Sequence, residues 1–260
     1  METLKRQLAT AGIEAIGLKV MTTVGIENIY CFPAKGGDEA IALWRKLRAM
    51  VSLTKFWPVL LGSEKQASNR VGTEPLTNES VAETIKYAST IVAAEYFLAR
   101  RKERLQEFVQ YNEGEDTESL GAKDGDWSDD LVPSNTFSTP FDIRTKKPLD
   151  RVIFALVPTI HSWEVPAYLF TGGWNACPEA SIHCAVAKYW FEKHGAEIMS
   201  ATHDVLEMSV MRPPTSRNDA IALARQQYDY CEDIVDQGTE TILGLASVLY
   251  YGKAWFFWWD

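Results

Sequence analysis

Cysteine and histidine are scarce in this sequence, with four of each among 260 residues. Four thiols in a chain of this length are too few for a disulfide framework, so we expect them to be reduced. Long apolar runs are also missing, because the longest, Ile242 to Tyr251, is about half of the ~20 residues that a spanning helix needs. Charged residues interrupt the first twenty positions, where a signal peptide would carry an apolar core. These absences predict a cytoplasmic protein without a membrane span.

Positive charge is in deficit. The 26 lysine and arginine residues are outnumbered by 35 aspartate and glutamate residues, which gives a formal net charge of −9. A field of this sign repels phosphate backbones and attracts cationic partners, so we expect a basic protein partner and no nucleic acid. The 46% hydrophobic and 23% charged residues are typical of a soluble globular protein that buries a sizeable core.

The signatures of common enzymes and cofactor sites are absent as well. The sequence contains no P-loop, no G-x-G-x-x-G and no G-x-S-x-G motif, so it lacks the backbone scaffolds for nucleotides and for a hydrolase nucleophile. It also lacks C-x-x-C and H-E-x-x-H pairs with the spacing of metal ligands. We therefore expect no cofactor.

All four histidines and two cysteines fall within residues 161–203, which raises the question of a zinc site. His183 and His194 lie eleven residues apart on one expected helix, and this separation corresponds to a rise of roughly 16 Å. Ligands of one metal lie within a few ångströms of each other, so the spacing argues against a metal. We interpret both histidines as partly buried polar edges of the helix and Cys184 as a small residue beside the core.

A change of composition divides the chain. Residues 112–150 begin with an acidic stretch, continue with a mixture of Pro, Ser, Thr and Lys, and show no apolar periodicity. We interpret this segment as an acidic linker or loop between residues 1–111 and residues 151–260.

Apolar periodicity and turn residues predict the elements of the first segment. They are a helix at Leu4–Ala11, a strand at Ile29–Phe32, a helix at Asp38–Met50, an edge or bulged strand at Phe56–Leu61, and a helix from Ser80 to about Tyr111. The expected edge position of the fourth element rests on Pro58, which has no N–H for a second neighbour.

The second segment has stronger signals. They predict a strand at Arg151–Val157 covered on both faces, a helix from Pro178 to Gly195, a hairpin turning at His203 and Asp204, a helix after Ser216, a helix at Thr239–Tyr251 and a terminal strand in AWFFWW. Together the patterns predict an α+β fold, with a mainly antiparallel sheet packed with helices and a smaller α/β N-terminal portion.

Several consecutive blocks of the second segment resemble one family. The blocks are SWEVPAYLFTGGWNACP (162–178), KYWFEKHGAEI (188–198), RPPTS (212–216), YDYCEDIVDQG (228–238) and the closing WFFWWD. They resemble the bacterial domain of unknown function 4253, over about 110 residues. LWRKLRA and FWPVLLG in the first segment resemble the upstream part of such proteins less distinctively. The resemblance implies a fold unit, and it carries over no catalytic residue.

Two groups of side chains are candidates for chemistry. Cys177 directly precedes Pro178 at an expected helix start, where a thiolate is stabilised, although a packing or capping role is more common there. An alternative catalytic set of a histidine and carboxylates consists of His203, Asp204, Glu207 and Asp233. Asp260 follows an apolar strand, and we interpret its carboxylates as partners of an arginine, Arg212 or Arg217.

Tryptophan in loops suggests recognition, because its large rigid side chain is enriched at interface hot spots. Trp163, Glu164, Trp174 and Asn175 flank two consecutive glycines, and Trp127 lies in a loop with eight acidic residues and one lysine between Glu113 and Asp130. These five are the candidate binding residues. The competing interpretation is that the rings of Trp163 and Trp174 cap the sheet.

The charge, the acidic loop with its tryptophan and the missing catalytic spacing favour a non-catalytic cytoplasmic protein-binding module. An immunity-type neutraliser of a basic partner, such as a toxin, is the most specific form of this hypothesis. The alternative is a hydrolase or transferase that uses the histidine and carboxylate set of residues 151–260. An aromatic-lined ligand site is a third possibility.

Overall fold

The computed structural model describes residues 1–24, 27–69, 78–111 and 124–260, and its centre is a single seven-stranded sheet. The strand order is β1-β2-β4-β3-β5-β6-β7. All neighbouring strands are antiparallel except β3 and β5, which are joined in parallel through Leu60 and Ser200. The predicted α+β class with a mainly antiparallel sheet is confirmed. None of the described helices combines the length and apolar character needed to cross a membrane.

The elements follow the predicted order closely. Strands are β1 (Lys19–Val24), β2 (Glu27–Ala34), β3 (Trp57–Leu60), β4 (Val152–Val157), β5 (Ala196–Ala201), β6 (Val205–Val210) and β7 (Ala254–Trp258). Helices are α1 (Glu2–Thr10), α2 (Gly37–Ala49), α3 (Val51–Thr54), α4 (Glu64–Asn69), α5 (Asn78–Ala88), α6 (Ala93–Tyr111), α8 (Val165–Leu169), α9 (Ala180–His194), α10 (Arg217–Tyr230) and α11 (Ile242–Leu249), with a 3₁₀ turn η1 (Ser162–Glu164) and a π-helical turn η2 (Ile234–Thr239).

Both segments of the sequence contribute strands to this sheet. β4 lies between β2 and β3, so that Leu156 faces Tyr30 on one side and Pro58 on the other. All six residues of β4 except Ile153 are buried, as expected for an apolar strand covered on both faces. The strands of residues 1–111 and 151–260 therefore share one sheet and do not form two separate ones.

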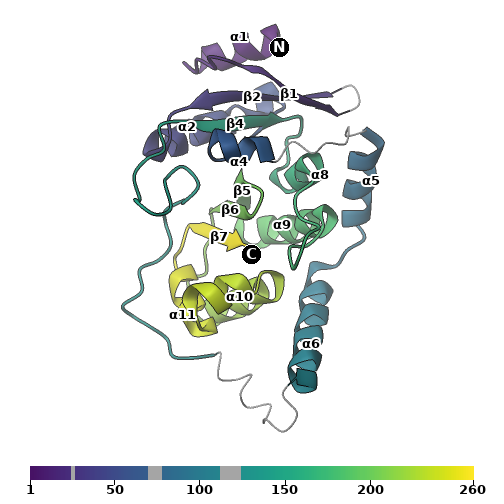
Figure 1. Cartoon of the computed structure of the whole chain (residues 1–260), viewed down its shortest axis with the longest axis vertical. Coiled ribbons are helices and arrows are strands. Elements are labelled where there is room, and N and C mark those ends of the chain that lie inside the picture. The colour runs from purple at the N-terminus through teal and green to yellow at the C-terminus, as the bar shows by residue number, and fades with distance from the viewer. Residues whose placement is uncertain (25–26, 70–77, 112–123) are drawn as a thin grey trace.

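Helices cover both faces of the sheet (Figure 1). On one face, α2 is fixed by Trp44, whose Nε1 donates to Pro58 O at 3.1 Å, and by Arg48, which pairs with Glu197 of β5. On the other face, α9 inserts the fully buried Trp190, which stacks on Phe257 of β7 with 5.3 Å between ring centroids. α10 and α11 lie at the β7 end of the molecule, and α1 lies at the β1 end.

The predicted edge position of β3 is wrong, because β3 pairs with β4 on one side and with β5 on the other. Leu61 N–H donates to Ile153 O at 2.8 Å, and the alternation of the antiparallel ladder then directs the nitrogen of Pro58 away from β4. On the β5 side the parallel ladder contains only the Leu60 and Ser200 pair. The proline thus occupies a position where neither neighbour needs its missing N–H.

The single helix expected from Ser80 to about Tyr111 is wrong as well, since the chain forms α5 and α6 with a break between them. At the break the Ser89 hydroxyl donates to Lys86 O at 2.6 Å, and the Thr90 hydroxyl donates to Tyr87 O at 2.7 Å. Side-chain hydroxyls that take up main-chain carbonyls in this way compete with the helical hydrogen bonds.

The described part of the 112–150 segment, residues 124–150, runs back across the α2 face of the sheet with no helix of its own. Ser138 anchors it, because its N–H and hydroxyl both donate to the buried carboxylate of Glu207 on β6, at 2.5 and 2.8 Å. Thr139 N–H and the Ser200 hydroxyl donate to the same carboxylate. Residues 112–123 of the predicted acidic loop lie outside the described residues.

Candidate functional site

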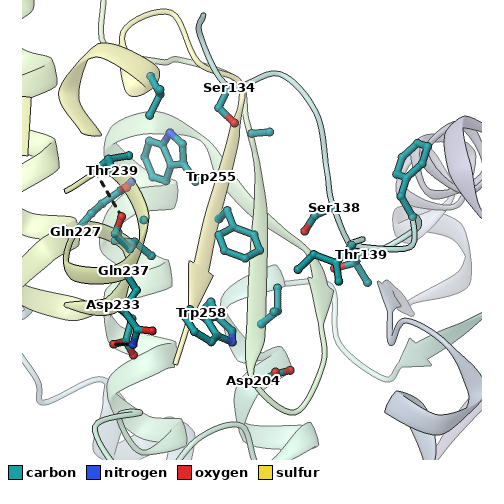
Figure 2. Close-up of a pocket in the computed structure, with 18 of the residues that line it drawn as sticks. Ser134, Ser138, Thr139, Asp204, Gln227, Asp233, Gln237, Thr239, Trp255 and Trp258 are labelled. Carbon is teal, nitrogen blue, oxygen red and sulfur yellow. Dashed lines mark hydrogen bonds between the residues drawn. The ribbon is translucent and has the colours of Figure 1, made fainter. Parts of the chain in front are cut away.

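A cavity of about 660 Å³ lies beside β7, and we call it the β7 cavity. Its walls come from β7, α10, η2, α11, the turn before β6 and the segment 134–149. Figure 2 shows Gln227, Asp233, Gln237 and Thr239 on one side of β7, and Ser138 and Thr139 on the other. Clefts of this size, with apolar walls and a few polar groups, are typical of ligand sites.

The charged residues lining the β7 cavity are all acidic. They are Asp142, Asp204 and Asp233, and none of the described lysine, arginine or histidine residues lines the cavity. None of the three aspartates forms an ion pair within the described residues. Hydrogen bonds from Thr145 lower the pKa of the Asp142 carboxyl, which keeps it charged. Asp233 accepts from Gln237 Nε2 at 2.9 Å. The lining therefore favours cationic groups.

The inner wall of the β7 cavity holds polar groups that no other described residue satisfies. Gln227 of α10 is 0% exposed, and neither its Nε2 nor its Oε1 has a hydrogen-bond partner within the described residues. The indole N–H of Trp255, on β7, also has none. Burying such groups without partners costs free energy, so proteins rarely retain them without a reason.

η2 forms another wall of the β7 cavity and has an uncommon backbone. Its residues Ile234–Thr239 form a π-helical turn, and Glu240 follows in the left-handed region with φ of 65°. π-helical turns occur often at functional sites, and a non-glycine residue at positive φ stores strain. Acidic lining, unsatisfied polar groups and an irregular backbone thus coincide at one place.

A second cavity, of about 870 Å³, lies between α2 and the segment 135–146. Its charged lining is mixed, because Arg45 and Lys146 lie beside Asp38, Glu207 and Asp142, and Asp142 lines the β7 cavity as well. This cavity therefore has no preference for one sign of charge, and its described polar groups do not single out a ligand class.

The structure places the candidate binding residues away from the β7 cavity, and none of the five lines it. Trp163 stacks on His161 at 4.4 Å between centroids and contacts Phe191. Glu164 accepts a hydrogen bond from the Thr159 hydroxyl at 2.5 Å. The half-buried rings of this group lie against neighbouring aromatic side chains.

Trp174, Asn175 and Trp127 also have neighbours of their own. Trp174 stacks on His203 at 4.8 Å, and Asn175 Nδ2 donates to Asp260 O at 3.2 Å. Trp127 packs edge-on against Tyr250, with the Arg217 guanidinium 4.6 Å above its ring. Arg217 also pairs with Asp129, whereas no hydrogen bond to Asp260 from either candidate arginine is present in the described residues.

The alternative catalytic residues are divided between different surroundings. Asp204 and Asp233 line the β7 cavity, His203 is exposed on the hairpin turn, and Glu207 is 1% exposed beneath the segment at Ser138. No hydrogen bond or ion pair joins any two of the four within the described residues. The side chain of Glu207 serves to anchor the chain.

Buried thiol and imidazole groups form a polar chain in the interior. Cys177 Sγ lies 3.5 Å from His183 Nε2, and His183 Nδ1 is hydrogen-bonded to the Tyr230 hydroxyl. All four cysteines are free and buried, and burial raises the pKa of the Cys184 thiol to about 12. Within the described residues, no three histidine, cysteine or acidic side chains group as metal ligands.

Sequence reasoning missed Gln227 and Trp255 as site residues. Gln227 continues the apolar stripe of α10, because it follows Leu223 by one helical turn and lies on the buried face with Ala220 and Ala224. A polar side chain on an otherwise apolar helix face can be recognised in the sequence and marks a candidate site residue.

Comparison with known proteins gives no significant match to a curated protein or to a solved structure. One family model does match, and it covers residues 153–260, from β4 through β7, including the α10, η2 and β7 walls of the cavity. The resemblance seen in the sequence is confirmed for this region: residues 153–260 match the model of the family described as Domain of unknown function (DUF4253).

Proposed function

We propose that this protein is a non-catalytic binding module whose β7 cavity receives a basic segment of a partner protein. The observation that carries the proposal is that, among the residues the structure describes, three aspartates and no cation line the cavity. Charge complementarity of this kind speeds association and selects partners by sign. The net charge of −9 adds a long-range attraction for the same class of partner.

The arrangement of ionisable groups supports binding over catalysis. A general acid and base must lie within hydrogen-bond reach of a common reacting group, and His203 and Glu207 do not line the cavity with Asp204 and Asp233. We propose a cytoplasmic location for the module. The most specific form of the proposal is an immunity-type neutraliser, which would cover the cationic surface of a toxin.

Titration with a basic peptide tests the proposal. The probe is an acetylated and amidated heptapeptide of alternating arginine and threonine, and calorimetry at low and high salt gives its dissociation constant. We expect binding that weakens steeply as salt rises. Asp204→Asn combined with Asp233→Asn should weaken binding by about tenfold or more at low salt, because two cavity charges are lost.

The matched control is Glu14→Gln combined with Glu95→Gln, which removes the same charge from exposed positions outside the cavity. We expect the control variant to bind nearly as tightly as the unaltered protein. Equal weakening by both pairs of substitutions would show that only net charge matters, and would refute the assignment to the β7 cavity.

A further inference from the structure

β7 is the last strand of the sheet, so one of its two edges has no neighbouring strand. On the β6 side, Val210 N–H donates to Lys253 O at 2.9 Å. The alternation of an antiparallel ladder then directs the main-chain groups of Ala254, Phe256 and Trp258 toward the free edge. These are the groups that an added strand would meet.

The two ends of this free edge are already occupied. Ala254 N–H donates to Ser134 O at 2.9 Å, and Trp258 O accepts from Cys231 Sγ at 3.0 Å. Between them, Phe256 N–H and C=O have no partner within the described residues. Phe256 lines the β7 cavity and also the second cavity, so its unpaired donor and acceptor lie on a residue at the boundary of the site.

The unsatisfied groups of the inner wall, like the Phe256 main chain, require a ligand that supplies both a hydrogen-bond donor and an acceptor. A glutamine amide offers one acceptor and two hydrogens, and the Trp255 indole offers one more hydrogen. A peptide group, which presents one N–H and one C=O, pairs with the Gln227 carbonyl oxygen and with one of its two N–H hydrogens. Guanidinium and ammonium groups carry donors alone, so a basic side chain by itself leaves Gln227 Nε2 and Trp255 Nε1 unsatisfied.

We infer that the basic segment of the partner binds in extended form as an eighth strand beside β7. Its main chain pairs with Phe256, the Gln227 amide takes one of its peptide groups, and its cationic side chains lie toward Asp204 and Asp233. Such strand addition is a recurring mode of peptide recognition, in which main-chain bonds give affinity and side-chain pockets give specificity. The inference rests on the proposed function and specifies its ligand.

Charge argues against a second copy of this chain as the added strand. A second copy would bring another chain of net charge −9 to a cavity that no described cation lines. Gln227 has no exposed surface, so a peptide that reaches its amide must displace part of the cavity wall that covers it.

The test compares three peptides of equal charge. The first is the arginine and threonine heptapeptide, and the other two carry a methyl group on the backbone nitrogen of every threonine or of every arginine. Strand pairing uses the N–H groups of alternate residues, so at least one methylated peptide should bind about tenfold more weakly. Equal affinity of all three, with the salt dependence retained, would overturn strand addition and leave the proposed function standing.

Amide exchange measured by NMR gives a second readout. Binding should slow exchange of the Phe256 N–H by about tenfold or more, because that group gains an acceptor. The Ala254 N–H, already bonded to Ser134, is the internal control and should change little. An unchanged Phe256 N–H in the peptide complex would overturn the inference.

Gln227→Met tests the inner wall. We expect this variant to bind the unmethylated peptide about tenfold more weakly. Gln226→Met is the matched control, because Gln226 is the adjacent residue, does not line the cavity and contacts Tyr189 instead. Equal affinity of both variants would remove Gln227 from the site. Failure of the unmethylated peptide to bind at any salt concentration would refute both proposals, and dimerisation without peptide would identify a second copy as the occupant.

Discussion

Single residues at the β7 cavity show where stability and binding oppose each other. The Gln227 amide is buried without partners, a state that costs about 1–3 kcal/mol relative to a satisfied or apolar group. A residue kept only for stability at this position of α10 would be apolar, as its neighbours on the same helical stripe are. An amide at this position is explained by the proposed binding role, in which a ligand supplies its hydrogen-bond partners.

Gln227→Met should therefore make the folded protein more stable. Methionine has a similar length and helix propensity without the unsatisfied polar atoms, so we expect the free energy of unfolding to rise by about 1 kcal/mol. Denaturant unfolding followed by circular dichroism measures the change. Gln226→Met, which loses hydrogen bonds to Trp190 and Tyr189, should be neutral or destabilising. A loss of stability in Gln227→Met would show that the amide is satisfied in solution.

At the scale of elements, the contact of α6 with α10 depends on a buried charge. Asp229 of α10 has a side chain with 0% exposure and pairs with Arg101 and Arg104 of α6, at 2.6 Å each. Arg104 also lies over the Tyr228 ring, 4.1 Å from its centroid. Removing one partner of a buried pair leaves an uncompensated charge, which is strongly destabilising.

Asp229→Asn should lower the free energy of unfolding by about 3 kcal/mol, because two guanidinium groups lose their shared carboxylate. Thermal or denaturant unfolding measures the loss. Glu103→Gln is the control, since Glu103 pairs with Arg100 on the surface of α6 with a side chain 55% exposed. The control should change stability by less than about 1 kcal/mol. Similar effects of both substitutions would contradict the role of burial.

At the scale of the whole molecule, the residues that the family model matches do not contain the complete sheet. Residues 153–260 include β4 but lack β2 and β3, which pair with it on both sides. A fragment of these residues would expose two edges of a buried apolar strand, a condition that promotes aggregation. The family match and the folding unit therefore have different boundaries.

We expect residues 153–260 expressed alone to be insoluble or unfolded, and residues 1–152 co-expressed with them to restore solubility. Size-exclusion chromatography and circular dichroism of both preparations measure the outcome. The full chain is the control. A monomeric fragment 153–260 with cooperative unfolding would show that β4 needs neither neighbour.

Local signals predicted most elements. The wrong edge position of β3 reflects a long-range contact, whereas the break between α5 and α6 reflects the local hydroxyls of Ser89 and Thr90. The alternation in AEIMSAT and VLEMSVM predicted β5 and β6 with their turn, and the Ser216 cap of α10 accepts from Asp219 N–H as expected. The central position of β3 depends on pairing with β4, about a hundred residues later in the chain. Local sequence patterns do not show that two segments so far apart in the chain pair with each other.

The site was less predictable than the fold. Asp204 and Asp233 were identified as functional candidates, and the structure places both at the β7 cavity. Gln227 and Trp255 were not predicted as site residues. Their side chains lack hydrogen-bond partners within the described residues, and this is a property of three-dimensional packing. Trp163 and Trp174 stood out by residue type, yet they lie against His161 and His203.

The insertion of β4 between β2 and β3 has a consequence for biosynthesis. The ribosome makes β2 and β3 first, and neither is the final neighbour of the other. The nascent chain must keep these two strands from pairing incorrectly until Val152–Val157 emerges to join them. α2 contacts β3 through Trp44 and is made before β4. We expect this contact to keep β3 away from β2 until β4 is available for pairing.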